Sequence, residues 1–226
     1  MGKIVKSPRI SINKLADYTD ANSSRRKKII EECKYPDDVR FLQTWYNDAK
    51  KYVAKYCTTG FDVDILDKGM KTIAAKPALD PTSVTRNKSN AEVLALLKSI
   101  EFPDLSNFNV YVYKGENKKL EIKGVDISAY PDIIIEGVHR KNPIVGALKF
   151  QYSSGNQLTE EPRKSVSALL VKFLQDEYPK HKAHLPLCLS IDIHQQGITA
   201  APKTIISRFN QIDACCEEIA DRWDSI

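Results

Sequence analysis

The chain of 226 residues carries 34 basic and 29 acidic side chains, a formal net charge of +5, and its length suits one large domain or two small ones. Hydrophobic residues make up 42% and charged residues 28%, which disfavours a collagenous chain, a disulfide scaffold and disorder throughout. No apolar run approaches the roughly 18 residues that a membrane-spanning helix needs. The five cysteines are odd in number and form no Cys-x-x-Cys motif. We therefore expect a cytoplasmic protein with reduced thiols and no contact with membranes.

The basic excess is confined to the first 60 residues, which hold 13 Lys and Arg against 7 Asp and Glu. It peaks in a run of four cations, Arg25, Arg26, Lys27 and Lys28. Such a cluster attracts the phosphates of nucleic acid, so DNA is a predicted partner with these side chains as its contacts. Glu31 and Glu32 follow one turn later, and the alternative is therefore a solvated helix face with internal ion pairs.

Three short helices are predicted at the start of the chain, which we expect to form a basic helical module over residues 1–60. Ser11 is placed to cap the first helix, and Ser23 or Ser24 to cap the second. The apolar pattern weakens afterwards, and two prolines combine with turn-forming residues. This combination predicts a linker or excursion over residues 61–89.

From residue 90 onward, alternating and amphipathic segments predict an α/β domain over residues 90–226. Strands are expected at 108–113, 120–123, 125–137, 143–152, 187–193 and 198–200, and helices at 91–99, 160–178 and 205–223. The segments 125–136, 143–151 and 187–193 are expected to share one sheet. Short connections between successive strands predict antiparallel neighbours. The expected fold is therefore α/β, or α+β, with a central mixed sheet flanked by helices.

Two strands of this domain carry residues of a recognisable chemistry. Pro131-Asp132 enters one apolar strand, and Ala147-Leu148-Lys149 follows on the next, 15 residues after Asp132. Phosphodiester hydrolysis uses hard cations held by carboxylates, and a lysine beside the metal can orient the attacking water. Residues two apart on a strand face the same side, so an acid and a lysine at that spacing reach one centre.

The element order and these residues resemble the PD-(D/E)XK nuclease-like superfamily over roughly residues 90–200. The resemblance implies a restriction-endonuclease-like core, Mg²⁺ as cofactor, and Asp132 and Lys149 as catalytic residues. One acid is missing, because Ala147 stands where the family carries Asp or Glu. Either another ligand replaces it or the catalytic site is lost. In both cases Asp132 and Lys149 are expected to lie about 3 to 6 Å apart, and a purely structural ion pair is the alternative.

Several residues could replace the missing acid. Gln151 shares the strand face of Lys149 and is a further catalytic candidate, while Glu92 on the preceding helix and Glu136 on the strand of Asp132 are candidate metal ligands beside Asp132 itself. Asp126, Glu160 and Glu161 are further candidates.

Two functions are consistent with this pattern. The first is a metal-dependent nuclease-like protein acting on DNA, active or inactive, from a phage or bacterial defence system. The second is a non-catalytic module that binds nucleic acid or protein on the same scaffold, which Ala147 favours. Weaker signals add little: His181 and His184 are expected in a surface loop, and Trp45 in the core or an interface.

Overall fold

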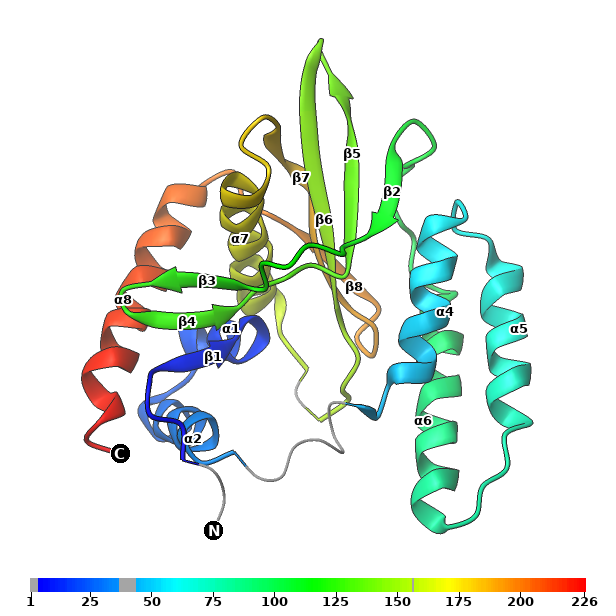
Figure 1. Ribbon diagram of the computed structural model, residues 1–226, viewed down its shortest axis with the longest axis horizontal. Coiled ribbons are helices and arrows are strands. Elements are labelled where there is room, and N and C mark those ends of the chain that lie inside the picture. Colours follow the sequence, from blue (N-terminus) through cyan, green and yellow to red (C-terminus); the bar gives the residue numbers. More distant parts are fainter. Residues whose placement is uncertain (1–3, 37–43, 156) are drawn as a thin grey trace.

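The computed structural model describes residues 4–36, 44–155 and 157–226, which contain two mixed sheets and seven α-helices. The central sheet has the strand order β2-β5-β6-β7-β8 (Figure 1). Its strands are β2 (Asn109–Val112), β5 (Ile133–His139), β6 (Asn142–Gln151), β7 (Lys182–Asp192) and β8 (Gly197–Ala200). β6 and β7 are parallel, and the other pairs are antiparallel. The predicted central mixed sheet flanked by helices is confirmed.

Helix α7 (Glu160–Glu177) joins the two parallel strands, because a parallel pair needs a crossover connection. Both faces of the sheet are buried, which explains the continuous apolar runs of the central strands. Ile134 of β5 packs into the core cluster on the α7 face, whereas Ile133 and Ile135 pack into a second cluster on the opposite face. The sheet is therefore the middle layer between two helical layers.

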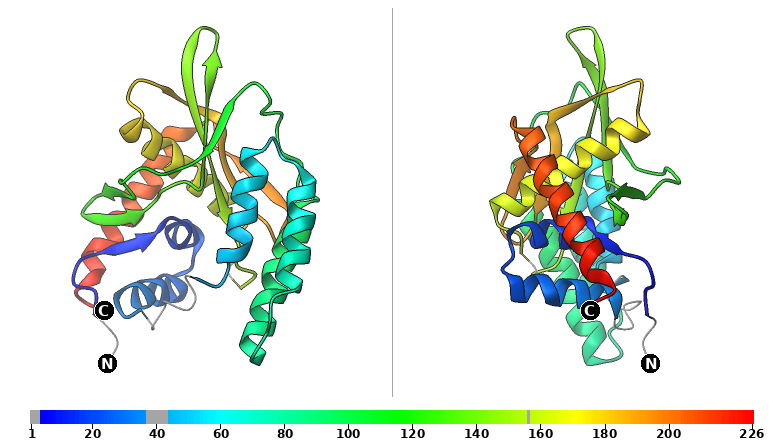
Figure 2. Two further views of the ribbon diagram at one scale, coloured as in Figure 1. Left: turned by 45° about the vertical axis from the view of Figure 1, so that its right-hand side comes forward. Right: turned by 90° about the vertical axis from the view of Figure 1, so that its left-hand side faces the viewer.

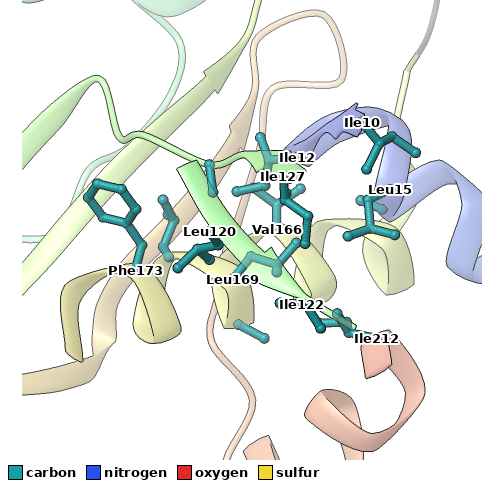
Figure 3. Packing of buried hydrophobic residues seen from close by; sticks show 14 of the residues in the cluster. Ile10, Ile12, Leu15, Leu120, Ile122, Ile127, Val166, Leu169, Phe173 and Ile212 are labelled. Carbon is teal, nitrogen blue, oxygen red and sulfur yellow. The ribbon is translucent and has the colours of Figure 1, made fainter. Parts of the chain in front are cut away.

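The α7 face is also covered by α1 (Ile12–Asp20), α2 (Ser23–Lys34), α8 (Ile205–Trp223) and a small sheet. The order of that sheet is β1-β4-β3, with β1 at Arg9–Ser11, β3 at Lys119–Ile122 and β4 at Val125–Ser128. Figure 3 shows Leu120 and Ile127 of the small sheet packed beside Val166 and Leu169 of α7. The indole N–H of Trp223 donates to the Val5 carbonyl at 3.3 Å, so the two ends of the chain meet on this face.

The opposite face carries α4 (Asn47–Thr58), α5 (Val63–Ala74) and α6 (Pro81–Leu97), which stay together on one side of the sheet in Figure 2. α5 and α6 pack closely at Gly69, where an added Cβ would lie 2.7 Å from atoms of Leu94 and Tyr52. Within the described part of the chain, no helix is long and apolar enough to cross a membrane. All five cysteines are free.

Two domain predictions need correction. The expected linker over residues 61–89 is mostly helical, because it holds α5 and the first half of α6. The expected module over residues 1–60 is not one unit: α1 and α2 belong to the core cluster on the α7 face, whereas α4 packs into the other cluster. The start expected for a third helix near residue 36 borders residues 37–43, which lie outside the described residues.

The single strand expected at 125–137 is also wrong. It is two strands, β4 and β5, which belong to different sheets and are separated by Ala129, Tyr130, Pro131 and Asp132. Pro131 has no N–H to donate to a strand neighbour, which favours a break at this point. His184 lies in β7 and not in a loop, since that strand begins at Lys182.

Candidate functional site

Asp132 and Lys149 form a close pair where β5 begins and β6 ends. Lys149 Nζ lies 3.3 Å from Asp132 Oδ1 and donates to the Tyr130 carbonyl at 3.0 Å. The Phe150 backbone N–H donates to Asp132 Oδ2 at 2.9 Å. The exposed fractions of the two charged side chains are 13% for Lys149 and 25% for Asp132. The predicted approach of these two residues is confirmed, and both carboxylate oxygens of Asp132 have partners within the protein.

A cavity of about 520 Å³ opens beside this pair. Four parts of the chain line it: the β1–α1 junction, the start of α4, the segment between β4 and β5, and the end of β6 with the residues after it. Among the described residues, its charged lining consists of two lysines and one carboxylate, Lys50, Lys149 and Asp132. Its aromatic lining consists of Trp45, Tyr46, Tyr130, Phe150 and Tyr152.

Lys50 enters this cavity from α4. Its Nζ lies 5.4 Å from the ring centre of Tyr152. Partial burial lowers the pKa of Lys50, Asp132 opposes that change, and the positive charge of Lys149 adds to it. The Tyr130 ring lies 4.4 Å from Lys149 Nζ. With two ammonium groups against one carboxylate in its described lining, the cavity attracts anions.

The Gln151 side chain, the predicted third catalytic residue, belongs to the same cavity. The Asn13 side-chain amide donates to the Gln151 side-chain oxygen. Asn13 lies in the first turn of α1, so this contact brings the N-terminal segment over the end of β6. The Gln151 side-chain oxygen thus has a partner within the protein, and this contact holds α1 against the cavity wall.

The surroundings of position 147 explain why the chain has no acid there. The Ala147 side chain is fully buried, between Ile134 of β5 and Cys188 of β7 in the strand register. It belongs to the core cluster that contains apolar residues of α1 and α7. A carboxylate in that position would lose its hydration without gaining a charged partner, which is costly. A small apolar residue is therefore the stable choice.

The expected metal ligands are not brought together. Glu136 lies in β5, four residues after Asp132 and about 13 Å from it at the rise of a strand. Its carboxylate lies beside Tyr111, whose pKa is raised chiefly by burial and further by Glu136. Glu92 is exposed on α6 and outside the cavity lining. Its charge nevertheless acts on Tyr46 of the lining, whose pKa is raised chiefly by burial and further by Glu92. The other three candidates pair with lysines elsewhere: Asp126 with Lys119, and Glu160 and Glu161 with Lys164.

Within residues 4–36, 44–155 and 157–226, no three His, Cys, Asp or Glu side chains are grouped so that they could hold a metal ion. Mg²⁺ prefers carboxylate oxygens and retains several of its waters. The described lining offers it a single carboxylate, and that carboxylate lies beside two ammonium groups. This donor set does not fit the magnesium ion that the nuclease resemblance implies.

The basic run at residues 25–28 is largely paired within the protein. Arg25 lies 2.6 Å from Asp17 and 3.3 Å from Glu32, and Arg26 lies 2.7 Å from Glu218. The farther pair, Lys27 with Glu31, is separated by 3.8 Å. These contacts agree with the alternative of internal ion pairs, and binding of DNA by Arg25, Arg26, Lys27 and Lys28 stays a prediction.

Four residues of the cavity were missed or misread from the sequence. Lys50 and Asn13 lie on separate helices far from Asp132 along the chain, and no local pattern connects them with it. Trp45 was expected in the core or an interface but lines the cavity. Tyr130 directly precedes Pro131-Asp132, and this position next to a predicted site residue is the signal by which the sequence could have indicated it.

No protein-family model matches this sequence, and no curated protein matches it either. Its function is therefore argued from the cavity and the charged surfaces themselves.

Proposed function

We propose that this chain is a non-catalytic nucleic-acid-binding protein with a restriction-endonuclease-like core, and that its cavity binds single-stranded nucleic acid. The strand order supports the core: antiparallel β2, β5 and β6 are followed by a crossover helix and the parallel strand β7. The order of strands, a helix and a further strand is the one that the resemblance implies. Asp132 and Lys149 also occupy the two positions at which the sequence matches the family.

The observation that carries the binding function is the combination of cations and aromatic rings in one cavity. Proteins that bind single strands join a positively charged groove for the backbone with aromatic side chains on which bases stack. Lys50 and Lys149 supply the charge, and five aromatic residues share the lining. Asp132 fixes the position of Lys149 without cancelling the charge of Lys50, because the described lining has no second carboxylate.

A metal-dependent nuclease acting on DNA, from a phage or bacterial defence system and with Mg²⁺ as cofactor, is the second candidate. The 3.3 Å separation of Lys149 and Asp132 favours it, because the family uses both residues. Its weakness is Ala147, which is buried and cannot supply the missing ligand. We therefore rank it below binding alone.

Fluorescence anisotropy with labelled ten-nucleotide single strands of DNA and RNA, in EDTA, tests the binding proposal. We expect Lys50→Gln to weaken binding at least fivefold and to reduce the salt slope by about 0.7, the value for one phosphate contact on a single strand. Lys51→Gln is the matched control, because Lys51 is exposed on the same helix and outside the cavity lining. Trp45 offers a second signal, since the chain has only one other tryptophan, Trp223, and that one is 2% exposed.

The same oligonucleotides incubated with Mg²⁺ or Mn²⁺ separate the two candidates. We expect binding without cleavage. Cleavage that needs the metal and is lost in both Asp132→Asn and Lys149→Gln would establish the nuclease instead. Failure to bind any single strand in EDTA, with no quenching of Trp45 fluorescence, would refute the binding proposal.

A further inference from the structure

The β5–β6 hairpin ends in a two-stranded ribbon at the far end of the central sheet from the cavity. β2 pairs with β5 only as far as Glu136, and β7 pairs with β6 only from Ile144. Residues 138–143, here called the hairpin tip, therefore have no neighbouring strand on either side among the residues that the structure describes. Figures 1 and 2 show the hairpin extending beyond the other elements. β6 runs ten residues from the tip to the cavity, which is about 30 Å at the rise of a strand.

Unpaired positive charge gathers at this end of the sheet. Arg140 and Lys141 form the turn of the hairpin tip, and the pairing of Ile144 with Lys182 brings the start of β7 beside it. Residues 138–143 and 180–184 contain no acidic side chain, and their four lysine and arginine side chains are exposed. Within the described ranges of the chain, none of these four forms an ion pair. The Arg25–Lys28 run differs, because most of its charge is paired.

The turn carries two cationic residues in a backbone conformation that favours other residue types. Arg140 and Lys141 have φ values of 49° and 68°, and they are the two central residues between the paired His139 and Asn142. Two-residue turns with both φ values positive favour Asn, Asp and Gly. The β3–β4 turn has Lys123 at φ 51° in its first position and follows that preference at its second, where Gly124 has φ 75°. Strained residues that persist in a structure point to a functional constraint.

We propose that the hairpin tip and the start of β7 bind the phosphate backbone of duplex nucleic acid, with the ribbon entering the major groove. The major groove, about 12 Å wide, admits a two-stranded β-ribbon. Arg140 and Lys141 then reach phosphates from the turn, while Lys180 and Lys182 contact the backbone beside the groove. Val138, 70% exposed, is the one large hydrophobic residue in the tip, too little apolar surface for insertion into a membrane. This surface is separate from the cavity and does not depend on the cavity's function.

The test replaces the turn residues by those that the backbone prefers. Arg140→Asn combined with Lys141→Gly should keep or raise the melting temperature, because both residues accept the left-handed conformation. The same variant should bind a labelled 20-base-pair duplex at least tenfold more weakly. It should also show a salt slope smaller by about 1.8, the value for two lost phosphate contacts. A melting temperature that does not fall excludes misfolding as the cause of weaker binding.

The matched control is Lys68→Gln with Lys71→Gln, which removes the same charge from exposed positions on α5. Duplex affinity within twofold of the wild type in the turn variant would overturn the proposal. So would an equal loss in the control, which would make net charge the cause. A loss confined to vesicles containing phosphatidylserine, with duplex binding kept, would assign the surface to anionic lipid and overturn it as well. The turn variant should leave single-strand binding unchanged, whereas Lys50→Gln should reduce it, so the two proposals can fail separately.

Discussion

Removing the Asp132 carboxylate is the sharpest test of how the cavity is built. Lys149 is 13% exposed, and without Asp132 the described part of the chain leaves its ammonium group the Tyr130 carbonyl at 3.0 Å and the Tyr130 ring. Breaking a fully buried ion pair costs about 3–5 kcal/mol. The partners that remain, and the 25% exposure of Asp132, reduce the expected cost of Asp132→Asn to about 2 kcal/mol. Asp132→Ala should cost about 1 kcal/mol more, because it also leaves the buried Phe150 N–H without its acceptor.

The coupling between the two residues can be measured with a double-mutant cycle. We expect Asp132→Asn, Lys149→Met and the double variant to reveal a coupling energy of about 1 kcal/mol, measured by urea unfolding. The single change Asp132→Asn should lower the melting temperature by about 4–8 °C in a chain of this size. The exposed pair Lys119–Asp126, 65% and 40% exposed, is the matched control, with an expected coupling below about 0.5 kcal/mol. Additive effects at Asp132 and Lys149 would show that the two charges do not interact in solution, and the cavity would lose its fixed lysine.

Two further predictions concern the sheet. Gly146→Ala should destabilise the protein by about 2–3 kcal/mol, because an added Cβ would lie 2.6 Å from the Leu187 carbonyl oxygen beside the bulge of β6; a melting temperature equal to that of the wild type would contradict this packing. Burial lowers the pKa of His184 below its ordinary value of 6.5, so the unfolded chain binds this proton more tightly and the free energy of unfolding should fall as the pH drops through 6.5. His184→Gln should therefore gain stability relative to the wild type between pH 7 and 5.5, and urea titrations with parallel pH profiles would contradict this.

The central sheet was largely predictable because each of its long elements has a clear period. The buried runs at 143–152 and 187–193 became β6 and β7, and the amphipathic segments became α7 and α8. The prediction of a linker at 61–89 was wrong because its turn-forming residues are also typical of helix starts. Asp80 and Pro81 are turn formers, but Asp80 accepts from the Ser83 N–H at 2.8 Å and caps α6, and Pro81 stands in its first turn, where a missing N–H costs little.

The site was predictable only where its residues are neighbours in the sheet. Asp132 directly precedes β5 and Lys149 lies on β6, the second strand of the same hairpin, so the strand period alone places them side by side. Asn13 reaches Gln151 across 138 residues of sequence, and Lys50 arrives on a helix of the opposite layer. Such contacts depend on how the layers close around the sheet, and no single segment encodes them.

The packing of α1 over the sheet affects both the residue at position 147 and the wall of the cavity. α1 packs against α7 with Ile12 and Leu15 in the same core cluster as Ala147, so that position 147 faces apolar side chains. The same helix places Asn13 on Gln151 at the cavity wall. A carboxylate at position 147 would have to be buried under this helix among apolar side chains, which is costly. The apolar surroundings of position 147 and the position of Gln151 at the cavity wall are therefore consequences of one arrangement, the packing of α1 over the sheet.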